Sequence, residues 1–374
     1  MKKFITVYDR YIFTQVLTTT LVAILLFTIV WIAPEMLLNT IKKILEGVYS
    51  VKTGILVLFY ELPKILGKAF PVGLLLGSLF TFDKLSKDSE LTIFRAVGMS
   101  FGRIVAPLLV LSLIFTWLCF ITYDKLIPYS CQKLQEIKGG QTVTQYIYTK
   151  KDVNNHPHQA VIVSRYSKGI MTGVVVMNFS KEVFDDLHGL SNILVGEVGR
   201  YGKDKKGRPC WKLRRVTSYK IDENGIFHEI KEMPRAEILN GQDAVDAYTI
   251  MINSTKRDRD INNKELRHYV NLLKRENLDE EYRLMLNKYY QRFFHPFVCV
   301  LLAIMGCLLG FSKPREQRLI GFTIAIGCIF LYYITLPFFD LLAEKGVIYP
   351  ILSAAIPPLA FLGAIIMFYK SKEL

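Results

Sequence analysis

Residues 104–123 read IVAPLLVLSLIFTWLCFITY, a run without Asp, Glu, Lys or Arg. A helix that rises about 1.5 Å per residue needs about 20 such residues to cross a hydrocarbon core of about 30 Å. Four further runs are at least as long and equally free of charge: residues 11–34, 293–312, 319–339 and 346–369. The pattern therefore predicts five membrane-spanning helices.

A sixth span is expected in residues 57–82, where the apolar character is weaker. Residues 69–82 are uncharged but short, and residues 53–67 are apolar apart from Glu61 and Lys64. We expect one long or broken helix here. Residues 11–34 could instead be a cleaved signal peptide, but the run is too long and no small-residue cleavage site follows it. We therefore expect a retained span.

The composition indicates an integral membrane protein rather than a nucleic-acid binder. Of the 374 residues, 51% are hydrophobic, and the mean hydropathy is +0.26. Much of the formal net charge of +14 flanks the apolar runs, whereas a nucleic-acid binder gathers such charge on a compact domain. We expect no nucleic-acid partner.

The Lys and Arg residues of the short loops predict the orientation of the chain in the membrane. Six spans place both termini and the second and fourth loops on one side, which carries Lys2, Lys3, Arg10, Lys84, Lys87, Arg95, Arg103, Lys313, Arg315, Arg318, Lys370 and Lys372. The opposite short loops carry only Lys42, Lys43, Lys52 and Lys345. We therefore expect an inner-membrane protein with cytoplasmic termini and a middle domain outside the cytoplasm.

The polar middle of the chain has the pattern of short β-strands. Apolar runs at residues 160–163, 173–177, 193–195 and 211–216 alternate with turn-rich segments such as 154–157 and 222–225. This spacing indicates a sandwich or an open, jelly-roll-like sheet. A helix should follow, with Asn263 as its N-cap and one apolar face made by Leu266, Tyr269, Val270 and Leu273.

The expected domains are three spans in residues 1–124, a β-domain in residues 125–262, and a connecting helix with three more spans in residues 263–374. No catalytic set, cofactor site or metal-ligand spacing stands out. Residues 47–53 lack the second glycine of a phosphate-binding loop. Cys131 and Cys210 are the cysteines outside the expected spans; we expect two thiols there, with a disulfide as the alternative. The chain is therefore not expected to be an enzyme.

Several short motifs, in this order, resemble the LptF/LptG (YjgP/YjgQ) permease family. The motifs are Asp9-Arg10-Tyr11-Ile12 before the first span, residues 89–98 (SELTIFRAVG) after the second, Leu266-Arg267-His268-Tyr269-Val270, and Gln291-Arg292-Phe293-Phe294-His295-Pro296 at the fourth. Each motif alone is weak, but their order and spacing are specific, and together they cover essentially the whole chain.

The resemblance implies lipopolysaccharide export toward the outer membrane. Two such permeases pair with a cytoplasmic dimer of an ABC ATPase, which hydrolyses the ATP. They extract lipopolysaccharide from the inner membrane and pass it to a periplasmic bridge protein. The β-domain is expected to take the acyl chains along an apolar inner face. The spans contain no row of acids or histidines for proton or sodium coupling, which agrees with a separate ATPase.

Residues 88–100 are expected to form a short coupling helix on the cytoplasmic side. Asp88 or Ser89 can cap it, Leu91 and Phe94 would share a face with Gly98, and Gly98 would end it. The resemblance implies that Glu90 pairs with a basic residue of the ATPase, with Leu91, Phe94, Arg95 and Gly98 beside it. The alternative is a solvated connector on the membrane surface.

Basic residues beyond the first span are expected to meet the lipid headgroup. Lys42 and Lys43 match the position of the family's phosphate-binding residues, and Lys suits phosphate as a compact cation. The alternative is ordinary interfacial snorkelling. The family often has a further basic residue where this chain has Pro34 and Glu35. Lys64 and Lys68 are candidates to compensate.

Two small-xxx-small sequences, at residues 73–77 and 306–310, allow close helix packing. We expect this packing inside the subunit, with an interface to a second permease as the alternative. A different function also stays open: a membrane-anchored assembly or mechanotransmission protein whose β-domain binds a protein partner. A membrane-embedded hydrolase ranks last. The sequence does not distinguish LptF-like from LptG-like, although Lys42 and Lys43 favour LptG.

Overall fold

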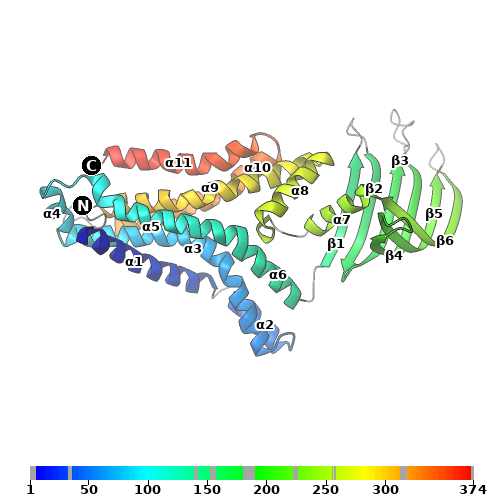
Figure 1. The fold of residues 1–374 in the computed structure, drawn as a ribbon, viewed down its shortest axis with the longest axis horizontal. Helices are drawn as coiled ribbons and strands as arrows, with labels where there is room; N and C mark the ends of the chain where they lie inside the picture. The colour runs from blue at the N-terminus through cyan, green and yellow to red at the C-terminus, as the bar shows by residue number, and fades with distance from the viewer. Residues whose placement is uncertain are drawn as a thin grey trace. The chain divides into compact units, whose positions relative to one another are not determined.

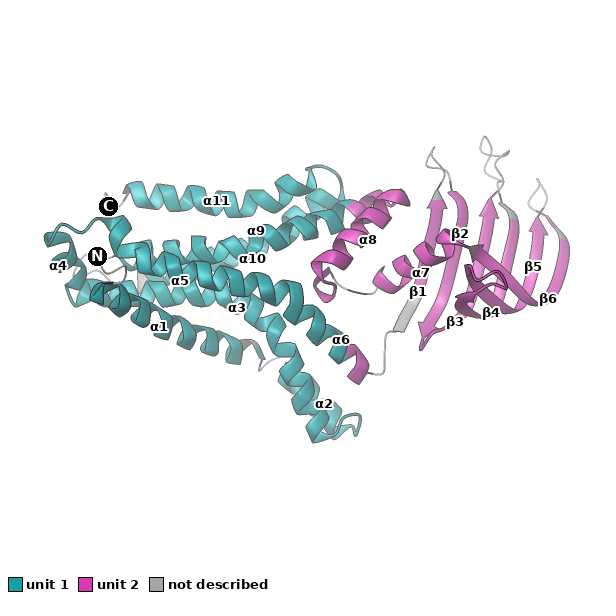
Figure 2. Cartoon of the chain, in the orientation of Figure 1, with its two compact units in different colours: residues 1–134, 283–374 teal, residues 135–282 magenta. Residues whose placement is uncertain are grey.

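The computed structural model describes residues 6–32, 36–138, 142–151, 157–179, 190–221, 226–254, 256, 258–311 and 318–371. The chain divides into two compact units (Figure 2): residues 1–134 with 283–374, and residues 135–282. The second unit begins and ends later in the chain than the expected β-domain of residues 125–262. It includes the expected connecting helix.

The first unit is helical. Its helices are α1 (Val7–Ile32), α2 (Leu38–Leu45), α3 (Val51–Lys87), α4 (Glu90–Ala96), α5 (Phe101–Ile121), the π-helical turn η2 (Thr122–Leu126), α6 (Ile127–Ile137), α9 (Asp279–Gly310), α10 (Arg318–Glu344) and α11 (Pro350–Ser371). Among the described residues, six helical segments are long and apolar enough to cross a membrane, as expected. The weakest of the six, α3, is one unbroken helix of 37 residues although Pro63 and Pro71 lie inside it.

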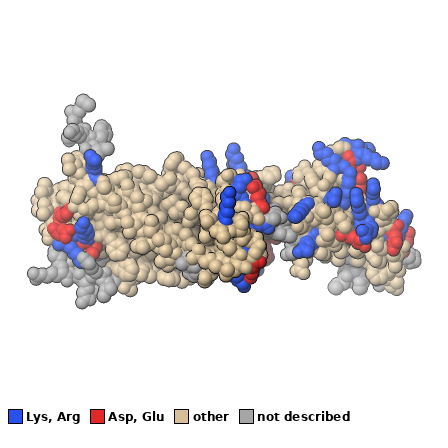
Figure 3. All heavy atoms as spheres, turned by 90° about the horizontal axis from the view of Figure 1, so that it is seen from below, with Lys and Arg blue, Asp and Glu red and all other residues tan. Residues whose placement is uncertain are grey.

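The surface of this unit matches a membrane environment. Its outward side chains include large apolar groups at Leu25, Ile29, Phe330 and Ile334, all more than half exposed. Figure 3 shows a broad belt of the helical unit without charged side chains, with Lys, Arg, Asp and Glu gathered toward its ends. Apolar surface of this extent would be a liability in water, and lipid is its natural cover.

Glycines set the close packing of three spans. A Cβ at Gly77 of α3 would lie 2.6 Å from the Cα of Thr20 on α1. A Cβ at Gly306 of α9 would lie 2.2 Å from the carbonyl oxygen of Leu75 on α3. Since only glycine allows such approach, both small-xxx-small sequences are used inside this subunit, and the expected internal packing is confirmed.

The second unit is a β-sheet with helices. The strands are β1 (Thr142–Lys151), β2 (Pro157–Ser167), β3 (Ile170–Phe179), β4 (Leu190–Lys203), β5 (Pro209–Ile221) and β6 (Phe227–Asn240). They pair antiparallel in chain order, β1 to β6, so the described strands form one open sheet (Figure 1) rather than the two sheets of a sandwich. Helices α7 (Gln242–Ser254) and α8 (Asn263–Arg275) follow, separated by the 3-10 turn η3 (Asp258–Asp260).

Helix α7 covers the apolar core of the sheet. Trp211 of β5 is fully buried, and its Nε1 donates a hydrogen bond of 2.9 Å to the carbonyl of Ala244 on α7. Alternate residues on neighbouring strands, such as Val161 and Val174, are buried as well. The sequence analysis did not predict α7. The indole N–H explains its place, because a buried donor needs an acceptor and the helix supplies one.

Helix α8 confirms the predicted amphipathic face but not the predicted cap. Leu266, Tyr269, Val270 and Leu273 are all buried. The N-cap is Asn262 rather than Asn263, because the Asn262 side chain accepts a hydrogen bond of 2.8 Å from the backbone N–H of Glu265. Cys131 and Cys210 are buried thiols, and no disulfide joins cysteines in the described part of the chain.

Candidate functional site

Helix α4 lies between α3 and α5, at the end of the helical unit where both chain termini lie (Figure 1). Its C-terminal end is the predicted one. Gly98 has a φ of +84°, its N–H bonds to the Arg95 carbonyl at 2.9 Å, and the Met99 N–H bonds to the Phe94 carbonyl at 3.1 Å. This pair of bonds is a Schellman motif, for which glycine is the natural residue.

The N-terminal end of α4 differs from the prediction. Ser89 occupies the N-cap position, with a φ of +60°, and its side chain makes no capping hydrogen bond. Asp88 follows the last residue of α3 and serves as the C-cap of that helix. The prediction that Asp88 or Ser89 caps α4 through its side chain is wrong, because the left-handed turn at Ser89 replaces the extended conformation of an ordinary N-cap.

The face of α4 that was expected to seek a partner is already covered by the chain itself. Leu91 is only 4% exposed and packs in the core cluster of the helical unit. The Phe94 ring meets the Tyr8 ring of α1 edge-on, with ring centroids 4.7 Å apart. Leu91 and Phe94 therefore fix the orientation of α4 on α1, α3 and α5, and they do not form its outer surface.

A different apolar pair faces outward. Ile93 is 58% exposed and Val97 is 77% exposed, four residues apart on one side of α4 and its last turn. The sequence analysis missed this pair. The i, i+4 spacing was visible, but Leu91 and Phe94, three residues apart, offered a competing apolar face. Arg95 and Gly98, two of the predicted site residues, are exposed as well.

Glu90 begins α4 and is half-buried. The Tyr11 hydroxyl of α1 donates a hydrogen bond of 2.9 Å to its Oε1. Glu90 therefore remains partly exposed, and the hydrogen bond from Tyr11 of α1 fixes one of its carboxylate oxygens.

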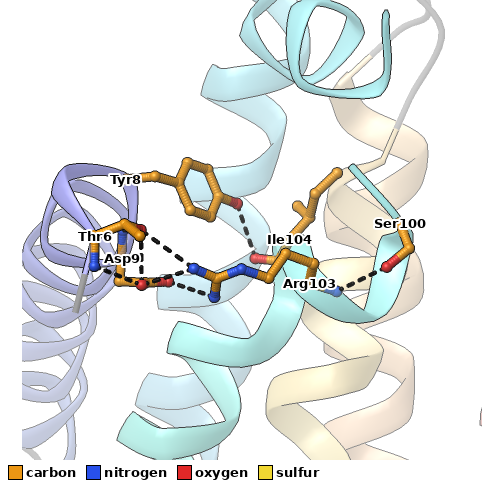
Figure 4. A network of polar contacts seen from close by, with 6 residues as sticks. All are labelled: Thr6, Tyr8, Asp9, Ser100, Arg103 and Ile104. Atoms are coloured by element: carbon orange, nitrogen blue, oxygen red, sulfur yellow. Dashed lines mark hydrogen bonds and ion pairs between the residues drawn. The ribbon is translucent and has the colours of Figure 1, made fainter. Parts of the chain in front are cut away.

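A polar network beside α4 joins the first turns of α1 and α5 (Figure 4). The Arg103 guanidinium donates two hydrogen bonds to the Asp9 carboxylate, of 2.6 Å from Nη1 to Oδ1 and 2.8 Å from Nη2 to Oδ2. Asp9 also accepts the backbone N–H of Thr6 at 2.9 Å, and Thr6 Oγ1 accepts the Asp9 N–H at 3.4 Å. This is a capping box for α1. The sequence analysis quoted both Asp9 and Arg103 without pairing them.

The predicted headgroup lysines lie on α2 and α3. Lys42 is exposed, with Glu46 at 3.9 Å, and the Nζ of Lys43 stands 5.3 Å from the centre of the Tyr49 ring. Lys64 pairs with Glu61 at 3.1 Å. Lys68 lies one turn later on α3, and its carbonyl accepts a hydrogen bond from the Tyr333 hydroxyl. Pro34 and Glu35 lie outside the described residues.

A further charged cluster, also missed, joins α9 to α10. Asp340 accepts hydrogen bonds from Asn287 at 2.8 Å and Gln291 at 2.7 Å, and it pairs with Lys288. The carboxylate is thus neutralised and saturated with donors. Such pairing is how a charge near a membrane span is tolerated.

Comparison with known proteins identifies the family. The family model described as "Lipopolysaccharide export system permease LptF/LptG" matches residues 10–371. The chain belongs to the LptF/LptG permease family. The resemblance drawn from the sequence motifs is therefore confirmed.

Individual LptF/LptG relatives are distant but span most of the chain. The lipopolysaccharide export system permease protein LptG of Haemophilus influenzae is 22% identical over 333 residues, 86% of each chain. LptG of Escherichia coli K12 is 22% identical over 365 residues, 95% of each chain. Family membership thus fixes the architecture of six spans with an inserted β-unit, and it makes this chain a transport permease rather than an enzyme.

Proposed function

We propose that this protein is the permease subunit of an ABC transporter that extracts lipopolysaccharide from the inner membrane and passes it to a periplasmic bridge. The observation that carries the proposal is α4. It is a short helix, held at the end of the spans where both termini lie, with Ile93 and Val97 exposed and Glu90 beside them. A transporter that hydrolyses no ATP itself needs such a surface for a separate ATPase.

The proposed orientation places α4 and both termini in the cytoplasm and the 135–282 unit in the periplasm. Support comes from the short-loop Lys and Arg residues, which are more numerous on the α4 side. In this orientation α4 faces the cytoplasm, where ATP is available. The open β-sheet then stands where it can receive acyl chains and hand them to the bridge protein.

Docking on the ATPase dimer would cover Ile93 and Val97 in a groove. Burial of a fully exposed aliphatic side chain contributes about 1.5–3 kcal/mol, so two such residues supply a useful part of a stable contact. Glu90 would meet a basic residue of the ATPase. Leu91 and Phe94 hold α4 in place for this contact, Gly98 ends the helix, and Arg95 is exposed.

Lys42 and Lys43 would bind the headgroup phosphates of lipopolysaccharide. The pair between Lys42 and Glu46 is long and exposed, and such pairs contribute about 0–1 kcal/mol, so Lys42 can exchange its partner at little cost. Lys64 is more committed, because Glu61 holds it at 3.1 Å. Lys64 and Lys68 would therefore act as secondary contacts.

A homologous second permease would complete the transporter. The relatives compared above are LptG proteins, and together with Lys42 and Lys43 they support the LptG-like member of the pair.

The test is gentle purification of the tagged chain, with mass spectrometry of everything that stays bound. We expect an ABC ATPase, a second permease of similar size and lipopolysaccharide. Recovery of the chain alone, or with envelope proteins and no ATPase, would favour an assembly protein. Lipid crosslinking inside the β-unit separates the two functions, because only the exporter passes lipid there.

A further inference from the structure

Three helices begin or end within one small region beside α4. Thr6 precedes α1, whose first two turns carry Tyr8, Asp9 and Tyr11. The first turn of α5 carries Arg103, and α4 carries Glu90 and Phe94. Helix α5 contacts α1 through an ion pair and a hydrogen bond, and α4 contacts it through an aromatic ring contact and a hydrogen bond. The set is therefore a junction, in which α1 is the common member.

The contact between α1 and α5 is both ionic and directional. Arg103 and Asp9 form a two-point pair, and the Tyr8 hydroxyl donates a hydrogen bond of 3.0 Å to the Ile104 carbonyl (Figure 4). A cation in the first turn of a helix opposes the helix dipole. Arg103 occupies such a position in α5, and the Asp9 carboxylate compensates for it. Two-point geometry also fixes the angle between the two side chains.

The contact between α1 and α4 uses the same turns of α1. The Tyr8 ring meets Phe94, and the Tyr11 hydroxyl holds Glu90. Tyr8 thus touches α4 with its ring and α5 with its hydroxyl. A shift of α4 against α1 would break the Tyr11–Glu90 bond and disturb the Tyr8 ring, which in turn would loosen the bond to Ile104.

We propose that the Asp9–Arg103 pair, with Tyr8 and Tyr11, is a latch that makes α4 and the start of α1 move as one body. A force on α4 then passes into α1, whose 26 residues run as one helix toward the α2 end of the unit. Asp9 and Arg103 are positioning residues in this view, since they act through Tyr8 and Tyr11 on α4. The inference rests on the proposed function for the origin of the force, but the latch itself is a property of the chain alone.

The variants separate the ion pair from the helix cap. Asp9→Asn keeps an oxygen that can accept the Thr6 N–H but loses the charge that Arg103 needs. Asp9→Glu keeps both the charge and the capping-box chemistry. Arg103→Gln removes the cation instead. Lys87→Gln removes an exposed cation at the same end, on α3, and serves as the matched control.

Two readouts are taken on the full-length permease. Hydrogen exchange of the α4 amides, residues 90–96, tests the latch without any partner. Lipopolysaccharide released per ATP hydrolysed, by the complex reconstituted with its ATPase, tests transmission. We expect Asp9→Asn and Arg103→Gln to speed exchange in α4 about tenfold, one factor of ten for each 1.4 kcal/mol lost. We also expect lipid release per ATP to fall by a similar factor, with ATPase binding and hydrolysis retained. Asp9→Glu and Lys87→Gln should match the parent protein.

Unchanged exchange in both latch variants would overturn the proposal, whatever the complex does. Faster exchange with unchanged lipid release per ATP would overturn it as well, because α4 would then be loosened without any loss of transmission. If the parent complex releases no lipopolysaccharide, the proposed function fails and transmission to α1 fails with it. The exchange result separates that outcome from a fault in the latch alone.

Discussion

Two short helices of the helical unit, α4 and α2, hold their polar side chains in opposite ways. The polar residues around α4 are bound by other helices: Glu90 by Tyr11, and Arg103 by Asp9, at 2.6–2.9 Å. Within the part of the chain that the structure describes, the lysines of α2 meet Glu46 and Tyr49, which lie close to them in sequence, at longer range. A fixed helix suits a protein groove of fixed shape, whereas long, loosely held lysines suit an anionic headgroup of variable pose.

The largest effect is expected from a change in α3, which lies between α2 and α4 in the chain. A leucine at Gly77 would drive its Cβ to 2.2 Å from Thr20 Oγ1 and to 2.6 Å from Thr20 Cα. Gly77→Leu should therefore separate α1 from α3 and lower the free energy of unfolding by about 3 kcal/mol or more. Thermal unfolding of the purified protein measures this loss.

The control for that variant is Gly327→Leu on α10. Nothing lies within 4 Å of a Cβ at Gly327, so this substitution should leave unfolding unchanged. Equal stability of the two variants would contradict the close packing of α1 on α3. Helix α3 could then not be the support that α2 and α4 share.

The next largest effect is expected at Glu90. Glu90→Lys places a cation opposite the basic residue proposed on the ATPase, and like charges in a contact should weaken binding about 100-fold. Glu90→Gln keeps an acceptor for the Tyr11 hydroxyl and should weaken it less. Co-purification of the ATPase and lipid release measure the effect. Normal transport by Glu90→Lys would show that α4 is not the coupling helix. Phosphate binding at α2 should not change in either variant.

The exposed pair on α4, Ile93 and Val97, distinguishes docking on the ATPase from packing within the chain. Ile93→Ser and Val97→Ser should each weaken ATPase binding about tenfold, as apolar residues at the centre of a contact commonly do, without altering the unfolding temperature. Thr92→Ser, an exposed neighbour, is the control. Loss of stability in Ile93→Ser, with ATPase binding intact, would mean that this face packs within the chain.

The smallest effect is expected at α2. Lys42→Gln and Lys43→Gln should each weaken binding of lipopolysaccharide about three- to fivefold, the range of an exposed ion pair, and more strongly at low salt. Lys52→Gln, an exposed lysine at the start of α3, is the control. Equal effects of Lys42 and Lys52 would indicate general attraction of the lipid to positive charge. A loss as large as that at Glu90 would remove the difference between the two helices.

The spans, the β-unit and the ends of some helices could be predicted because their signals are local. Uncharged runs of about 20 residues predict helices in a membrane, alternation predicts strands, and Gly98 predicts a helix end. The apolar face of α8 followed from spacing alone, with Leu266 and Leu273 both buried. In each case the deciding residues lie within one continuous stretch of about 20 residues or fewer.

The parts that were missed depend on contacts between distant residues. Asp9 and Arg103 are 94 residues apart, and Asp340 meets its partners across about 50 residues. Leu91 rather than Ile93 is buried because α1 and α5 pack on the Leu91 side of α4. A local sequence pattern predicts neither which charged residues pair nor which of two apolar faces is buried. Both depend on how the helices are arranged in the folded chain.

The length of α3 has a consequence for where the lysines stand. At 1.5 Å per residue its 37 residues make a rod about 55 Å long, against a hydrocarbon core of about 30 Å. Tilt alone would need about 57° to hide the excess, beyond the roughly 40° that membrane helices reach. Some ten residues of α3 must therefore overhang the hydrocarbon. Lys84 and Lys87 mark the other end, so the overhang is at the α2 side, where Val51, Ile55 and Phe59 are all more than half exposed and form an apolar ledge beside Lys52.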